Sequence, residues 1–205
     1  PLALMRAELD YALQHAASPE ELRSALLVAS DETDRLVQLA GGLLLIAGSD
    51  DGKLQLRREP IPANELLESV RNRFASRATE SERQLEIHAP ADLTINADRL
   101  RLEQAIGNLV DNALRHGHGI IRIEAHPNHE ATELHVRDQG PGLPKDFIPR
   151  AFERFTRANG AHAGAGLGLA IVHAIAVAHD GTAHALADGN PTDIWISLPA
   201  DTTTQ

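Results

Sequence analysis

The stretch LEQAIGNLVDNALR, residues 102–115, decides how the rest of the chain is organised. Asn108 and Asn112 are four residues apart, so on a helix they lie on one face, and Arg115 follows on the same side. The opposite stripe is apolar and consists of Leu102, Ile106, Leu109 and Ala113. Asparagine is mildly unfavourable inside a helix, because its side chain competes for backbone hydrogen bonds. The pattern predicts a helix that buries one face and uses another for a polar ligand, with two solvated asparagines as the alternative.

The composition excludes several classes of protein. With 42% hydrophobic but only 3% aromatic residues, the 205-residue chain is predicted to have an aliphatic core. Its formal net charge of −10 argues against nucleic acid or an anionic membrane as the main partner. The lack of cysteine excludes disulfides and thiol chemistry, and the 11 histidines show no metal-binding spacing. No apolar run reaches the ~18 residues of a membrane span, and because the chain begins at Pro1 we expect it to be part of a longer protein.

Residues 1–48 predict a helical hairpin. Ser18-Pro19-Glu20-Glu21 begins the second helix, with serine as N-cap and proline at the first helical position. An apolar stripe follows at spacings of three and four residues: Leu22, Ala25 or Leu26, Ala29, Thr33, Leu36, Ala40, Leu43 and Ala47. A lone hairpin cannot bury such a stripe, so we expect dimerisation into a four-helix bundle, with a coiled coil without chemistry as the alternative. The polar segment GSDDG at 48–52 predicts the boundary between a domain at 1–48 and a second domain at 49–205.

The second domain alternates between strand and helix patterns. Strands are predicted at 53–57, 84–88, 93–96, 119–125, 133–138, 182–187 and 193–198. Helices are predicted at 62–80, at 97–116, where Gly117 closes the helix, and at 167–178. Strands with helices laid to one side define an α+β fold, in which a mixed sheet is covered on one face.

Two glycine-rich stretches accompany this sheet. DQGPG at 138–142 follows a strand, where its glycines permit a sharp turn and Asp138 can accept a hydrogen bond from the edge of a flat ligand. GAGLGL at 164–169 precedes a helix, whose free N–H groups and dipole favour an anion. A simple strand-ending turn and helix-packing glycines are the respective alternatives, and neither stretch is a Walker A loop. The segment NGAHA at 159–163 predicts a lid that a ligand orders.

Four patterns in this order carry a family resemblance: NLVDNALR at 108–115, DQGPGLP at 138–144, FERF at 152–155 and GAGLGLAIV at 164–172. Together they resemble the ATP-binding domain of sensor histidine kinases, within the superfamily that includes gyrase, Hsp90 and MutL. The resemblance implies an N-terminal antiparallel hairpin for dimerisation, followed by an α/β sandwich with a mixed five-stranded sheet and about three helices on one face.

The N-terminal segment extends the resemblance. PLALMRAELDYAL at 1–13 is similar to the segment after the phosphoacceptor motif HELRTPL of that family, with Pro1 and Leu2 as the last two residues of the motif. The receiving histidine is therefore expected upstream of Pro1, and His15 is not given that role. By this interpretation the chain resembles a kinase core without its own phosphorylation site.

The resemblance also implies the residues that bind Mg·ATP. Asp138 would receive the adenine amino group, with Gly140 and Gly142 shaping the base pocket. Asn108 would hold Mg²⁺, an ion that prefers oxygen ligands, and Asn112 would lie near the phosphates. The other implied nucleotide contacts are Asp111, Arg115, His116, Leu143, Phe155, Arg157, Gly164, Ala165, Gly166, Leu167, Gly168 and Leu169. The implied catalytic residues are Asn108, Arg115 and Arg154.

The identity of residue 108 distinguishes ATP hydrolysis from phosphoryl transfer to a histidine. Gyrase-, Hsp90- and MutL-like proteins would have a glutamate there as general base for water, whereas an amide cannot take a proton. The resemblance therefore implies a cytoplasmic histidine kinase that passes the γ-phosphate to a histidine and onward to the aspartate of a response-regulator receiver domain. The parent sensor would be anchored in a membrane by its other parts. The alternatives are a catalytically silent nucleotide-binding scaffold and a protein-serine kinase of the anti-sigma-factor type, although proteins of that type lack the hairpin.

Overall fold

The computed structural model describes residues 55–128, 130–158, 166–186 and 191–200, together with residues 6, 10, 11, 18–23, 25, 26 and 29. The chain divides into two compact units, Pro1–Leu44 and Leu45–Gln205. The polar segment 48–52, where the sequence predicts a domain boundary, lies outside the described residues. Within the described ranges, no helix is both long and apolar enough to span a membrane.

In the first unit the described residues other than Ser18 are helical. The hydroxyl of Ser18 accepts a hydrogen bond from the N–H of Glu21 (3.2 Å), and its carbonyl accepts one from the N–H of Leu22 (3.2 Å). These bonds confirm Ser18 as the N-cap of the second predicted helix. Leu22 and Leu26 of the predicted apolar stripe are 36% and 56% exposed in the single chain. The part of the stripe beyond Ala29 lies outside the described residues.

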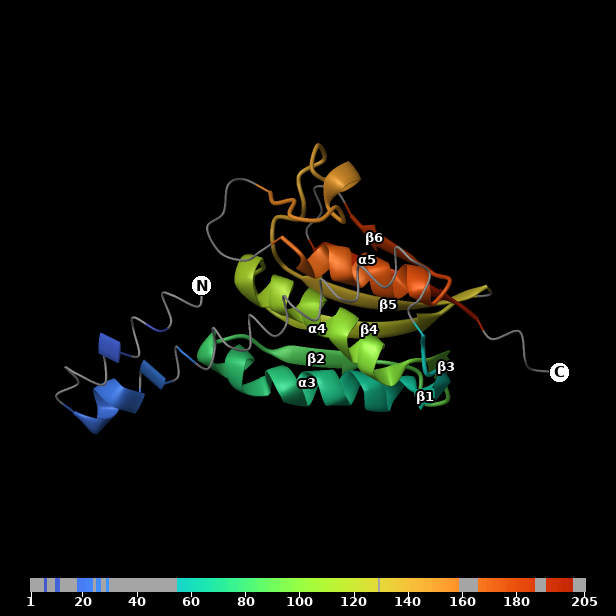
Figure 1. Ribbon diagram of the computed structural model, residues 1–205. Helices are drawn as coiled ribbons and strands as arrows, with labels where there is room; N and C mark the ends of the chain where they lie inside the picture. Colours follow the sequence, from blue (N-terminus) through green and yellow to red (C-terminus); the bar gives the residue numbers. More distant parts are fainter. Residues whose placement is uncertain are drawn as a thin grey trace. The chain divides into compact units, whose positions relative to one another are not determined.

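The second unit is built on a five-stranded sheet with the strand order β2-β4-β5-β7-β6 (Figure 1). Its strands are β2 (Leu85–His88), β4 (Ile121–Pro127), β5 (Ala131–Asp138), β6 (Thr182–Ala185) and β7 (Thr192–Pro199). β2 pairs with β4 in parallel, and the other pairs are antiparallel. This topology confirms the predicted α+β class with a mixed five-stranded sheet.

One face of the sheet is covered by α3 (Ala63–Glu80), α4 (Arg99–His116) and α5 (Gly168–Ala178). Figure 1 shows α4 between α3 and α5, and it packs against both. The predicted apolar stripe of α4 is buried, with exposures of 3% or less, at Leu102, Ile106, Leu109 and Ala113. The predicted inward residues of α3 are also buried: Leu66, Leu67, Val70 and Phe74. Phe74 is the one aromatic residue in the core of the described ranges, so the core is aliphatic, as the composition indicates.

A separate two-stranded sheet pairs β1 (Glu59–Pro62) with β3 (Thr94–Ala97). The strand predicted at 53–57 is wrong, because its described residues 55–57 are irregular and the strand lies further along the chain. β1 has the sequence EPIP, in which both prolines are exposed and Ile61 between them is 1% exposed. Proline disfavours a central strand because it has no N–H for the ladder, but a strand with one neighbour tolerates it. Burial of one isoleucine therefore outweighs the local propensity.

The start of α4 is held by two other segments. Asp98 caps the helix: its Oδ1 accepts from the N–H of Arg101 (3.1 Å) and its Oδ2 from the N–H of Arg57 (3.0 Å). The N–H of Asp98 donates to Nε2 of His179 (3.0 Å), whose Nδ1 donates to the carbonyl of Ile175 (2.8 Å). His179 follows the last residue of α5 and is 2% exposed. A neutral imidazole therefore joins the end of α5 to the start of α4.

This contact is expected to make stability depend on pH. Burial lowers the pKa of His179, and the charge of Arg58 lowers it further, although the carbonyl of Ile175 and the carboxylates of Asp98 and Asp180 oppose the shift. In the unfolded chain the imidazole titrates near pH ~6.5, so below that pH the unfolded state takes up a proton that the folded state resists. We expect the free energy of unfolding to fall as the pH drops from about 7 to about 5, and less so in His179→Gln.

Urea unfolding at a series of pH values measures this dependence. His88→Gln, at an exposed histidine of β2, is the matched control and should keep the wild-type dependence. The same pH dependence in wild type and His179→Gln would show that another group is responsible.

Candidate nucleotide site

Asn108 lies on α4 with an unsatisfied side-chain amide. Its Nδ2 is buried and has no hydrogen-bond partner, and it is the one such side-chain atom in the described part of the chain. A buried donor without a partner costs about 1–3 kcal/mol, so this atom of the half-buried Asn108 requires an explanation. A 180° rotation about the Cβ–Cγ bond of Asn108 exchanges Nδ2 and Oδ1, which puts the oxygen where the nitrogen was. An amide oxygen is a suitable ligand for Mg²⁺. The residues present therefore fit a divalent cation at Asn108.

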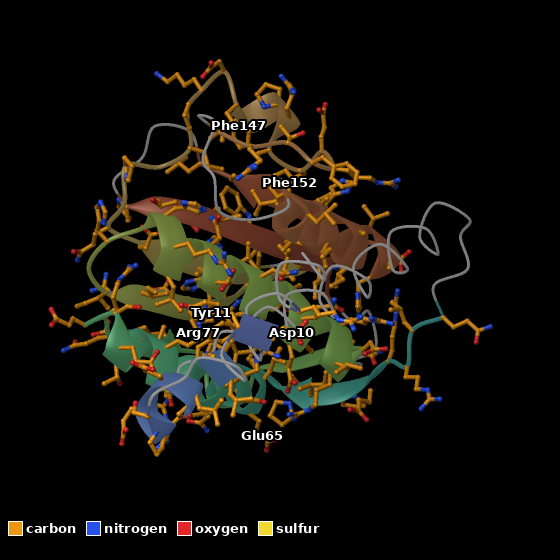
Figure 2. All side chains as sticks on the ribbon, turned by 60° about the vertical axis from the view of Figure 1, so that its left-hand side comes forward. Asp10, Tyr11, Glu65, Arg77, Phe147 and Phe152 are labelled. Carbon is orange, nitrogen blue, oxygen red and sulfur yellow. The ribbon has the colours of Figure 1, made fainter. Side chains whose placement is uncertain are left out.

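Arg115 follows on α4 and forms an ion pair within the helix. Its Nε lies 2.7 Å from Oδ2 of Asp111, and Oδ1 of Asp111 accepts a hydrogen bond from Nη2 of Arg77 on α3 (2.6 Å). Arg77 is labelled in Figure 2. Asp111 therefore lies between two guanidinium groups and ties α4 to α3. Its implied contact with the nucleotide stays a prediction, and Arg115 reaches a phosphate only by sharing or leaving this ion pair.

Asp138 ends β5 at the DQGPG turn. It is 5% exposed, and its Oδ1 accepts a hydrogen bond from the N–H of Gly140 (2.6 Å). Thr192, its partner in the register of β7, accepts at Oγ1 from the N–H of Gly142 (3.1 Å). Gly142 has a φ of +76°, a conformation that favours glycine. Oδ2 of Asp138 makes no hydrogen bond to the described residues, which leaves it able to accept one from a ligand.

Gly117 closes α4, but not for the predicted reason. A glycine after a helix commonly takes the left-handed conformation, whereas Gly117 has φ −90° and ψ 179°, which other residues can also adopt. Its constraint is space, because a Cβ on Gly117 would collide with the carboxylate of Asp138. Gly117 therefore belongs to the candidate site. The sequence carries no signal of this role beyond the helix end itself.

The second glycine stretch is described from Gly166 onward. Gly164, Ala165 and the predicted lid at 159–163 lie outside the described residues. The carbonyl of Gly166 accepts a hydrogen bond from the N–H of Phe155 (2.8 Å), and both residues have positive φ, +67° and +61°. This bond brings together the two ends of the segment on which the lid is predicted.

The segment between β5 and α5 positions the remaining implied contacts. It contains the short helix η1 (Ile148–Arg150), and the ring of Phe152, labelled in Figure 2, lies 6.1 Å from that of His173 on α5. Of the implied contacts, Leu167 is buried, and Leu143 and Leu169 are half-buried. Helix α5 begins at Gly168, one residue later than predicted. The exposed implied contacts are Arg115, His116, Arg154, Phe155, Arg157 and Gly168. Exposed guanidinium groups are suited to phosphate oxygens.

The other face of the sheet carries a charged network next to Asp138. Arg137 donates from Nε to Oδ2 of Asp193 (2.8 Å) and from Nη1 to Oε2 of Glu124 (2.5 Å). Nδ1 of His135 lies 2.9 Å from Oδ1 of Asp193. Burial would raise the pKa of Asp193, but the hydrogen bonds and charges of His135 and Arg137 hold it below its ordinary value. Neither this network nor any other group of described His, Asp and Glu side chains could hold a metal ion by itself.

Residues 97–202 match the family described as histidine kinase-, DNA gyrase B-, and HSP90-like ATPase. This match covers α4, β5 and α5 and agrees with the sandwich fold. The chain belongs to that family, as a catalytic domain of the sensor histidine kinase type.

Individual relatives support the narrower class. A probable sensor histidine kinase of Mycobacterium tuberculosis (strain CDC 1551 / Oshkosh) is 37% identical over 193 residues, which cover 92% of this chain and 50% of the relative. The signal transduction histidine-protein kinase BaeS of Escherichia coli K12 is 34% identical over 217 residues, with coverages of 98% and 44%. The structure of the Acinetobacter baumannii histidine kinase AdeS matches with a TM-score of 0.79 at 25% identity and covers 98% of this chain and 96% of that one. The chain spans about half the length of these two curated relatives.

Asn108→Ala tests whether the unsatisfied amide is kept for binding. Because the substitution removes a buried donor without a partner, we expect the free energy of unfolding to stay unchanged or rise by about 1 kcal/mol. We expect the affinity for an ATP analogue in the presence of Mg²⁺ to fall about tenfold or more. Urea unfolding and titration calorimetry measure the two effects.

Asn72→Ala, at an exposed asparagine of α3, controls for the higher helix propensity of alanine. If Asn108→Ala loses stability relative to Asn72→Ala, the amide of Asn108 has a structural role instead.

Proposed function

We propose that the chain is the ATP-binding kinase core of a sensor histidine kinase. It would bind Mg·ATP and deliver the γ-phosphoryl group to a histidine of a dimerisation helix, from which it passes to an aspartate of a response-regulator receiver domain. The observation that carries this proposal is the unsatisfied amide of Asn108, on the helix whose end abuts the buried carboxylate of Asp138. Phosphoryl transfer depends mainly on positioning and charge stabilisation, which such a site can supply.

Asp138 would recognise the adenine base. Its Oδ1 is occupied by the N–H of Gly140, so Oδ2 is the atom that would accept from the exocyclic amino group. Guanine presents a carbonyl oxygen at the corresponding position, and two acceptors face to face repel each other. A buried carboxylate left without a donor is costly, so this geometry favours adenine over guanine.

Asn108 would hold Mg²⁺ through its side-chain oxygen, while Asn112, Arg115, Arg154 and Arg157 would lie near the phosphates. The ion supplies charge neutralisation at the phosphate oxygens when it is bound. An amide at this position cannot remove a proton from water, which argues against fast hydrolysis. The imidazole of an acceptor histidine carries its own nucleophilic nitrogen and needs no such base.

We infer that the active form is a homodimer that works in the cytoplasm, where ATP is available. The exposed Leu22 and Leu26 support dimerisation, because a two-helix hairpin has to bury its stripe against a second copy. The relatives matched over 92% and 98% of this chain are sensor histidine kinases, which argues against the anti-sigma-factor type. Their class supports a response regulator as partner and a parent protein anchored in a membrane.

The experiment that tests the proposal is a calorimetric titration with non-hydrolysable ATP and GTP analogues, with and without Mg²⁺. We expect the wild type to prefer the ATP analogue and to lose affinity without Mg²⁺. Asp138→Asn keeps an acceptor for the N–H of Gly140 but offers an amino group to the base. We expect its preference for the ATP analogue to fall about tenfold or more, because the new donor matches guanine.

Asp146→Asn, at an exposed carboxylate in the segment between β5 and α5, is the matched control and should leave the preference unchanged. No binding by the wild type would contradict the proposed nucleotide site. Binding with an unchanged preference in Asp138→Asn would remove Asp138 from base recognition.

A further inference from the structure

We propose that Arg83 is a positioning residue for base recognition. Its guanidinium holds residues 117–119 in place, and this segment, termed here the 117–119 wall, lies against Asp138. The inference rests on the proposed function, in which Asp138 accepts the adenine amino group.

Arg83 lies in the turn between α3 and β2 and donates to three backbone carbonyls. Its Nε bonds to the carbonyl of Gly119 (2.6 Å), its Nη1 to that of Ala113 (2.6 Å) and its Nη2 to that of His118 (2.7 Å). The carbonyl of Ala113 also accepts the N–H of Gly117 (2.9 Å), so one guanidinium group joins the last turn of α4 to the segment that follows it. The planar fork of arginine suits such convergent acceptors.

Arg83 lies on one side of the 117–119 wall, and the end of β5 with Asp138 lies on the other. The carbonyl of His118 accepts the N–H of Gln139 (2.9 Å), and Gly117 leaves no room for a Cβ beside the carboxylate of Asp138. Burial lowers the pKa of Arg83, and the negative charge of Asp138 opposes that shift, in agreement with two groups that lie on either side of one thin segment. A displacement of the wall therefore changes the surroundings of Asp138.

The wall has little rigidity of its own. Two of its three residues are glycine, and Gly119 has a φ of +61°, a conformation from which a glycine can readily depart. Without Arg83, the carbonyl of Gly119 would turn to water, and the carbonyls of Ala113 and His118 would keep one donor each. The segment would then sample other conformations. Asn108 lies more than two turns earlier in α4, inside the packed part of the helix. Loss of Arg83 should therefore impair recognition of the base and spare the phosphate end.

Arg83→Met, which keeps an unbranched apolar stem but removes the guanidinium with its donors and charge, separates these effects. We expect the affinity for a non-hydrolysable ATP analogue to fall about tenfold and the preference over the GTP analogue to fall by a similar factor. The affinity for Mg²⁺-tripolyphosphate should stay unchanged, because that ligand has no base. Arg83→Lys, with one donor group in place of a fork, should recover part of the preference. Calorimetric titration gives all these values.

Arg122→Met is the matched control. Arg122 lies on β4 and forms an ion pair with Glu86 of β2 (3.0 Å), and it donates no hydrogen bond to the wall. It should leave affinity and preference at their wild-type values. Thermal unfolding of each variant identifies a temperature at which all variants are folded, and the titrations are carried out at that temperature.

The outcomes separate the inference from the proposed function. A wild type that binds neither analogue, or binds both equally, would contradict the proposed function. A wild type that prefers the ATP analogue, together with an unchanged preference in Arg83→Met, would overturn the role of Arg83 alone. An equal loss for the ATP analogue, the GTP analogue and tripolyphosphate would also overturn it, since Arg83 would then support only the fold. If Arg83→Met does not fold, the preference of Arg83→Lys decides the question in the same way.

Discussion

Helix α4 is fixed at both ends by side chains from other elements. At its start, the N–H of Asp98 is bonded to His179, and the carboxylate of Asp98 caps the helix. At its end, the guanidinium of Arg83 binds the carbonyl of Ala113 and two more from the following segment. The apolar stripe between these ends is buried against the sheet. A rotation of the helix would break these contacts, so they hold the buried Nδ2 of Asn108 in place although that atom has no partner.

The register of β5 and β7 fixes the other half of the site. Arg137 and Asp193 are paired in this register, next to the pair of Asp138 and Thr192. Side chains alternate across a sheet, so the charged pair lies on one face while Asp138 and Thr192 lie on the other. A slip of one residue would bury the charged network and expose the carboxylate of Asp138. Because a half-buried charge is costly without its partner, the network opposes that slip and thereby helps to specify where Asp138 lies.

The sequence predicts those parts of the molecule that have a local signature. Repeating apolar positions locate α3, α4 and α5, and the short motifs identify the family. The pattern misplaces β1, because this strand depends on the burial of Ile61 and not on local propensity. Gly117 has the sequence context of an ordinary helix-ending glycine, whereas its constraint is the distant Asp138. Arg83 has no local signature at all, because its three acceptors lie 30 to 36 residues away. Contacts between distant segments thus set the fine geometry of the site.

The acidity of the chain bears on how the proposed site would select its ligand. A net charge of −10 repels polyanions at long range, yet the screening length at physiological ionic strength is only about 8 Å. A small nucleotide that carries Mg²⁺ has much of its charge neutralised. Inside that distance it would meet Arg115, Arg154 and Arg157 of the proposed site and not the average charge of the surface. A nucleic acid spans many screening lengths and keeps the full repulsion. In the proposed site, local arginines would attract the phosphates of a small nucleotide, while the acidic remainder of the surface would repel larger polyanions.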